Sequence, residues 1–215
     1  MAAFSGDTYL KHHIHDLIKK HHVKTVVETG TFLGESTLAF ADMIPKVHTI
    51  ENNAQFASVA DKKFSDKPGI TLHRGSSPEV LHALCPKLKT DTLYFLDAHW
   101  YDYWPLLDEL TEIAQNPAIC KIIVIHDFVV PNTTLGYDSY IPPTTYKGLN
   151  LVMSLLDMMM RTIAPKASEV ILHKQKLDWQ YIEDHIRKIN PKFAYHYNSK
   201  ASGRKRGVIF IEFTD

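Results

Sequence analysis

Short apolar runs alternate with helical segments through the first 127 residues of the chain. Each run is continuously apolar, as is typical of strands that are buried on both faces. The segments between the runs carry apolar residues at helical spacing. The predicted strands span residues 25–28, 47–51, 70–72, 92–97 and 121–127, and the predicted helices span residues 36–43, 54–64, 78–84 and 105–115. This alternation predicts parallel βαβ units and an open, doubly wound sheet with helices on both faces.

The last third of the chain follows a different pattern. A polar, aromatic loop over residues 129–146 is long enough to indicate a lid or binding loop, although its tyrosines would also serve simply to pack it down. Helices are predicted near residues 147–160 and 178–189. Two apolar runs, 193–197 and 208–213, flank a turn-forming segment and predict an antiparallel hairpin. The complete pattern predicts a Rossmann-like α/β sheet of seven strands, mostly parallel, with this hairpin at its C-terminal edge.

The N-terminal segment mixes histidines and lysines with regularly spaced apolar residues. Ile14, Leu17 and Ile18 recur at helical spacing, which leaves the His and Lys side chains of residues 11–22 on the other face. A solvated amphipathic helix is therefore favoured over a metal-binding tract.

Composition narrows the functional class. The chain has 24 Lys plus Arg and 24 Asp plus Glu, so its formal net charge is zero and the electrostatic case for broad nucleic-acid binding is removed. No run approaches the roughly 18 apolar residues of a membrane span. Two cysteines, Cys85 and Cys120, lack metal-ligand spacing and predict buried thiols in a reducing, cytoplasmic compartment.

The residues that end the apolar runs are the candidates for chemistry, because ligands of open α/β sheets bind at the carboxyl ends of strands. Glu28 ends the first run and leads into a turn with Gly30 and Gly34. This Gly-x-x-x-Gly spacing matches neither the dinucleotide fingerprint nor a P-loop, and structural turn glycines would also explain it. Glu51 ends the second run 21 positions after Gly30, a distance at which an acid can accept both ribose hydroxyls of a nucleoside ligand.

With these motifs the chain resembles class I S-adenosylmethionine-dependent methyltransferases, on the Glu-x-Gly-x-x-x-Gly pattern of residues 28–34 and the acidic end of the second run. It is most similar to the catechol-type small-molecule O-methyltransferases and to the macrocin-type sugar O-methyltransferases. The stretches that carry this closer likeness are residues 50–52, 74–77, 95–100 and 105–107. The resemblance covers residues 23–127 and resumes in the C-terminal hairpin.

The resemblance implies which residues hold S-adenosyl-L-methionine. An anionic carboxylate is favoured near the helix N-terminus that follows the glycine turn. The implied contacts are Glu28, Gly30, Thr31, Gly34 and Ser36 around the methionine part, Glu51 and Asn52 at the ribose, Ser76, Ser77, His99 and Trp100 near the adenine, and Asp97 beside the cofactor.

Two acids, Asp97 and Asp127, end neighbouring apolar runs and are suited to hold a divalent cation. The catechol-type family uses these positions as magnesium ligands with an amide residue directly after the second, where this chain has Phe128. The macrocin-type family has two adjacent acids there, and this chain has His126 before Asp127. The predicted ligands are therefore Asp97, His126 and Asp127, for magnesium or a softer ion such as manganese. In the alternative, Asp97 contacts the cofactor or caps a helix, and Asp127 orders the next loop.

A second difference from the catechol-type family concerns the general base. That family places a lysine a few residues past the first Asp. Here no lysine occurs between Asp97 and Lys121. His99 is the nearest side chain with an ordinary pKa close to neutrality, so it is the predicted base, with Asp102 as second choice. In the alternative, His99 is only a neighbour of the adenine and has no role in proton transfer.

These features predict metal-assisted O-methylation of a small hydroxyl-bearing molecule, a sugar or an aromatic ring. The alternatives are a nitrogen or nucleic-acid acceptor on the same fold, and a catalytically silent cofactor-binding or scaffold protein. The cations of the turn 200–206 are predicted to be solvated, and the Met-rich segment 153–160 suits a helix core or a homodimer face equally. We expect one methyltransferase domain over residues 1–215, with an N-terminal helix (1–22), a cofactor-binding half (23–127) and a half with the substrate loop and hairpin (128–215).

Overall fold

The computed structural model describes residues 2–99, 103–140 and 175–214. Trp100, Asp102 and the helix predicted near residues 147–160 lie outside these ranges.

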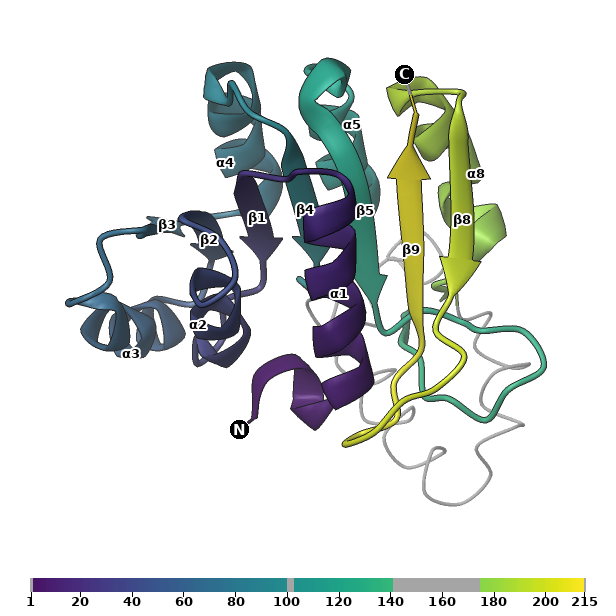
Figure 1. Ribbon diagram of the computed structural model, residues 1–215, viewed down its shortest axis with the longest axis horizontal. Helices are drawn as coiled ribbons and strands as arrows, with labels where there is room; N and C mark the ends of the chain where they lie inside the picture. Colours follow the sequence, from purple (N-terminus) through teal and green to yellow (C-terminus); the bar gives the residue numbers. More distant parts are fainter. Residues whose placement is uncertain (1, 100–102, 141–174, 215) are drawn as a thin grey trace, which may run out of the picture.

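A seven-stranded sheet forms the centre of the molecule, in the order β3-β2-β1-β4-β5-β9-β8 (Figure 1). The first five strands pair in parallel, and β9 runs antiparallel to both β5 and β8. This confirms the predicted mostly parallel sheet with a C-terminal hairpin. The strands are β1 (Thr25–Thr29), β2 (Lys46–Glu51), β3 (Ile70–Arg74), β4 (Thr92–Leu96), β5 (Cys120–His126), β8 (Phe193–Tyr197) and β9 (Val208–Phe213).

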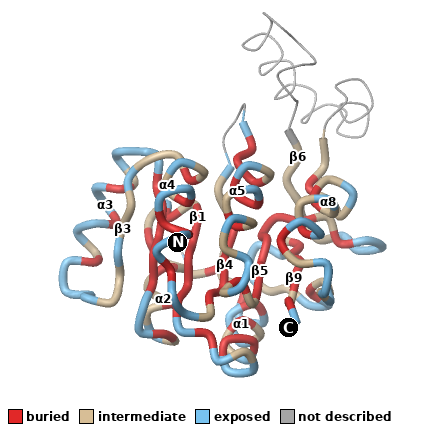
Figure 2. The backbone as a smooth tube through the Cα atoms, turned by 90° about the horizontal axis from the view of Figure 1, so that it is seen from above, coloured by how far each residue is buried: buried red, intermediate tan, exposed pale blue. Residues whose placement is uncertain are grey.

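Helices cover both faces of the sheet, as predicted. The α1 and α2 helices lie on one face, whereas α4, α5 and α8 lie on the other, and α3 packs beside β2 and β3 (Figures 1 and 2). The helices are α1 (Thr8–Lys20), α2 (Glu35–Ala41), α3 (Ala54–Phe64), α4 (Ser77–Leu84), α5 (Leu106–Ile113) and α8 (Trp179–Ile189). Three short 3-10 helices are η1 (Ala3–Gly6), η2 (Cys85–Lys87) and η3 (Pro117–Ile119).

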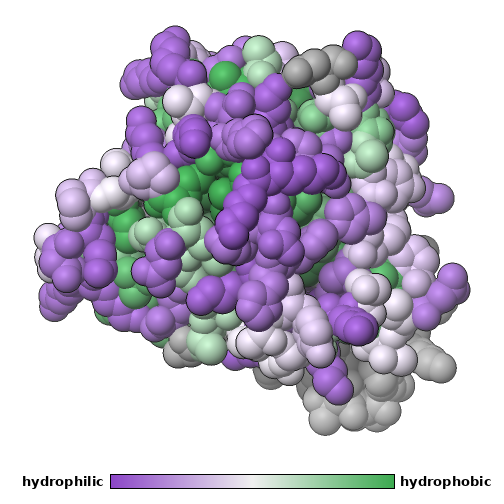
Figure 3. Space-filling model, viewed as in Figure 1, coloured by the Kyte–Doolittle hydropathy of each residue, from purple (hydrophilic) through white to green (hydrophobic). Residues whose placement is uncertain are grey.

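The N-terminal helix starts later than the predicted boundary at residue 1. Asp7 caps α1, because its carboxylate accepts hydrogen bonds from the backbone N–H groups of Tyr9 and Leu10. Leu10, Ile14, Leu17 and Ile18 are buried against the sheet, so the predicted apolar face is confirmed. The band over α1 in Figure 3 is mainly hydrophilic. A small antiparallel sheet of β6 (Ser139–Tyr140) and β7 (Gln175–Lys176), by contrast, is not predicted by the sequence pattern.

Successive strand residues point into two separate cores, one on each face of the sheet. Val26 and Leu93 belong to the core beneath α1 and α2, and Val27 and Tyr94 belong to the core beneath α4, α5 and α8. The central strands are therefore buried on both faces, as their continuous apolarity predicts (Figure 2). Both cysteines are free and buried, which confirms the predicted burial of the two thiols.

The carboxyl ends of β1, β2, β4 and β5 meet at one edge of the sheet. Strand order reverses between β1, which continues to β2, and β4, which continues to β5. In folds of this kind the ligand lies at that reversal. Among the residues that the structure describes, none forms a helix long and apolar enough to cross a membrane.

Candidate active site

The turn after β1 depends on glycine at Gly30. Its φ is +84°, and a Cβ atom there would lie 2.8 Å from the backbone oxygen of Asp97. The turn therefore packs closely against the chain that leaves β4. Gly34 has a different structural role from Gly30, because a Cβ atom at Gly34 would lie 2.6 Å from the Phe64 ring. Gly34 thus permits α2 to begin against α3, and its predicted contact with the methionine part stays a prediction.

A buried polar network lies next to this turn. The Glu28 carboxylate is buried and accepts hydrogen bonds from the hydroxyls of Thr37 and Thr49, the latter at 2.7 Å. Burial raises the pKa of Glu28 to about 8, even though both hydroxyls favour the ionised form. Thr31 Oγ1 lies 2.6 Å from Thr49 Oγ1, so the network joins the turn to β2.

Glu51 is held in place at the end of β2. Its two carboxylate oxygens accept hydrogen bonds from the backbone N–H groups of Phe32 and Asn53, both at 2.7 Å. These bonds fix the carboxylate beside the glycine turn, where the ribose is predicted. The neighbouring Asn52 is exposed.

Two of the three predicted serine contacts, Ser36 and Ser77, make hydrogen bonds within the protein. Ser36 Oγ accepts a hydrogen bond of 3.0 Å from the backbone N–H of Phe4, which sequence reasoning does not anticipate. Ser77 is buried, and its hydroxyl donates to the Glu109 carboxylate. Ser76 precedes α4 without a side-chain capping bond.

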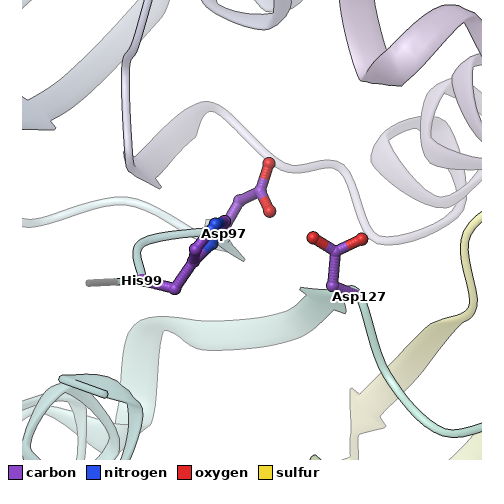
Figure 4. Close-up of side chains that lie close together, drawn as sticks. All are labelled: Asp97, His99 and Asp127. Atoms are coloured by element: carbon purple, nitrogen blue, oxygen red, sulfur yellow. The ribbon is translucent and has the colours of Figure 1, made fainter. Parts of the chain in front are cut away.

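Asp97, His99 and Asp127 form a potential cation site. One ligand atom from each side chain lies within 4.8 Å of the others. Figure 4 shows the two carboxylates at the ends of neighbouring strands, with His99 beside Asp97. Asp127 has a φ of +60°, an uncommon conformation for a non-glycine residue. Two carboxylates and an imidazole suit a divalent cation with oxygen and nitrogen ligands, so this donor set fits the metal that the resemblance implies.

His126 is not one of these three residues, but it lies close to both carboxylates. Its buried Nδ1 atom lies 3.1 Å from Asp97 Oδ1 and 3.0 Å from Asp127 Oδ1. Burial alone would lower the pKa of His126, but the two carboxylates raise it well above its ordinary value. This Nδ1 atom has no hydrogen-bond partner within the described parts of the chain, and the role of His126 as a metal ligand stays a prediction.

Arg206 is a functional candidate that the sequence prediction misses. Its Nε contacts Asp127 and its Nη2 contacts Asp138, so the prediction of a solvated turn is wrong for this residue. Burial opposes ionisation of Asp127, yet His126 and Arg206 together hold the pKa of Asp127 well below its ordinary value. Asp138 Oδ2 also lies 3.6 Å from His99 Nε2.

Glu109 on α5 is a second missed residue. It is buried, one of its oxygens accepts from Ser77, and the other, Oε2, has no hydrogen-bond partner within the described parts of the chain. Burial raises the pKa of Glu109 to about 7. Its place beside Leu110, on the face that also carries Leu106 and Ile113, is the sequence signal that could have revealed it.

A pocket lies where these side chains meet. Polar groups from the ends of β4 and β5, from α5 and from the following loop surround it, together with apolar side chains. The lining consists of Asp97, His99, Glu109, His126, Asp127 and Asp138, with Leu96, Ala98, Trp104, Leu106, Ile125 and Leu177. The pocket thus joins the predicted cation site to a partly apolar wall.

No protein-family model matches the chain, and no curated protein sequence matches it. Solved structures do match. The O-methyltransferase TomG from Streptomyces achromogenes, in complex with SAM, aligns over 96% of this chain and 80% of its own, at 15% identity and a TM-score of 0.59. SAM-bound CalS10, an amino pentose methyltransferase from Micromonospora echinaspora, aligns over 96% and 91%, at 12% identity and a TM-score of 0.55.

The chain has the class I methyltransferase fold. The same fold also occurs in precorrin 8w decarboxylase from Methanobacterium thermoautotrophicum, which aligns over 97% of this chain and 90% of its own, at 13% identity and a TM-score of 0.51. Identities this low establish the fold and leave the reaction to the residues of the site.

Proposed function

We infer that the protein is an S-adenosylmethionine-dependent methyltransferase that acts on a hydroxyl group of a small molecule. One observation carries this proposal. The Gly30 turn, the fixed Glu51 carboxylate and Asp97 meet at the point where strand order reverses, and Gly30 leaves room for close backbone approach. TomG and CalS10, which share the fold, are described with SAM bound.

The cofactor supplies an electrophilic methyl group when it is bound, and the residues of the chain fix its orientation. Ser36 Oγ already accepts the Phe4 N–H bond, so its own proton is available for an anionic carboxylate at the start of α2. Glu51 has remaining lone pairs for the ribose hydroxyls. Such alignment is the main contribution that a protein makes to a displacement reaction.

Asp97, Asp127 and His99 would hold a divalent cation, and His126, which lies close to both carboxylates, would position them. A cation bound there would increase the acidity of the acceptor hydroxyl at neutral pH. An imidazole nitrogen that binds a metal cannot also take a proton. We therefore assign His99 to the cation in the metal-assisted reaction, and its role as base to a reaction without the cation.

The acceptor would approach Asp97 and Asp127 from the mouth of this pocket, whose own free volume of about 20 Å³ holds little more than one water molecule. The acceptors that the sequence indicates are a sugar and an aromatic ring.

The reaction is tested with a panel of catechols and sugars, with SAM and either manganese or a chelator, and with product mass as the readout. A gain of one methyl group on a hydroxyl supports the proposal. Methylation of nitrogen acceptors alone, or of none with SAM bound, would instead support the alternative acceptor or the silent scaffold.

The cation site is tested with Asp97→Asn and Asp127→Asn, against the exposed Asp42→Asn as a matched control. We expect at least tenfold weaker manganese binding in the first two variants, because each loses a charged ligand. The control should bind manganese as the unmodified protein does. Unchanged manganese affinity in both site variants would show that the site is wrongly placed.

A further inference from the structure

Arg206 is fixed at the predicted cation site from both its backbone and its side chain. Gly136 N–H donates to the carbonyl of Lys205 at 2.9 Å, and Gly207 N–H donates to the carbonyl of Gly136 at 2.8 Å. Any Cβ atom at Gly136 would lie 2.9 Å from Arg206 Nη1, so glycine at this position leaves room for the guanidinium. The loop after β5 and the turn before β9 are thereby joined around Arg206.

The guanidinium bridges two carboxylates from different parts of the loop. Its Nε contacts Asp127 Oδ1, and its Nη2 contacts Asp138 Oδ1. Arginine keeps its charge at every pH at which a protein is folded. A permanent positive charge therefore touches one of the two acids that would bind the cation.

A divalent cation and Arg206 would share Asp127. Both are positive, and both would contact one carboxylate that is mostly removed from solvent. The repulsion between the cation and the guanidinium is appreciable, because both would contact the same carboxylate and buried charges are screened less than exposed ones. Asp138 offsets part of the charge of Arg206 and also holds it in place.

We propose that Arg206 is a built-in competitor for Asp127, which lowers the affinity of the site for divalent cations. This inference rests on the cation site of the proposed function. Arg206 is assigned as a positioning and affinity-setting residue, because it contacts Asp127 and is not among the residues that line the pocket.

The test is a titration with manganese, in which binding is measured by calorimetry and by the electron paramagnetic resonance signal of free manganese. Arg206→Gln removes the charge, and we expect it to bind manganese at least tenfold more tightly than the unmodified protein. Arg206→Lys keeps the charge, and its affinity should stay within about threefold of the unmodified protein. Arg204→Gln, an exposed change of equal charge in the same turn, is the matched control and should have little effect.

Equal or weaker manganese binding by Arg206→Gln would overturn the inference and leave the cation site standing. A gain of affinity in Arg206→Lys as large as in Arg206→Gln would also overturn it, because charge would then not be the cause. Absence of manganese binding in every protein, with thermal unfolding confirming that each is folded, would reject the cation site itself. The two failures are therefore distinguishable.

Discussion

Gly30 is the position where a single methyl group should disturb the site most directly. Its φ of +84° disfavours any other residue, and a Cβ atom would meet the Asp97 backbone oxygen. We expect Gly30→Ala to lower the free energy of unfolding by about 1–3 kcal/mol. Gly6→Ala is a matched control, with a similar φ of +79° but ordinary contact distances. Urea denaturation should show the larger loss for Gly30→Ala, and an equal loss would contradict the close approach.

The sequence places some site residues well and others poorly, for physical reasons. Asp97, Asp127 and Glu51 are predictable because each ends an apolar run, and parallel strands bring such ends to one edge. Arg206 is not predictable in this way, because its contact with Asp127 joins residues that are 79 positions apart in the sequence and meet only through the register of a hairpin turn. His126 is adjacent to Asp127 in sequence, but its approach to both carboxylates depends on the burial of the end of β5.

At the scale of elements, Glu109 joins α5 to α4 through Ser77 and should make stability depend on pH. Burial raises the pKa of Glu109 from 4.5 to about 7, so the folded protein keeps a proton that the unfolded chain releases. The free energy of unfolding therefore falls as pH rises from about 4.5 to about 7. Glu109→Gln cannot ionise at this position. We therefore expect its free energy of unfolding to decrease by roughly 1–3 kcal/mol less over this pH range than that of the unmodified protein.

Urea denaturation of both proteins at pH 5 and pH 8 measures this effect. Glu28 also lowers the free energy of unfolding as pH rises to about 8, but it does so equally in both proteins. The difference between them therefore reports Glu109. Identical pH dependence of the two proteins would contradict a buried, proton-holding carboxyl at this position.

At the scale of the whole molecule, the parallel strands and the two cores follow from the hydrophobic pattern, whereas the order of the strands is given by the structure. Continuous apolar runs predict the parallel strands, and the paired runs at the end predict the hairpin of β8 and β9. The pattern does not predict η1, because Phe4 is the one aromatic residue of this short segment and its burial depends on the distant rings of Phe40 and Phe95. The pair β6 and β7 is too short to leave a pattern.

The central claim is that the edge of the sheet at Gly30, Glu51 and Asp97 binds S-adenosylmethionine. Calorimetric titration with that cofactor, with a nicotinamide dinucleotide as comparison, tests it most directly. We predict saturable binding of S-adenosylmethionine at one site, no binding of the dinucleotide, and about tenfold or more weaker binding in Glu51→Gln, which loses a charged acceptor. Absence of S-adenosylmethionine binding to the folded, unmodified protein would contradict the account.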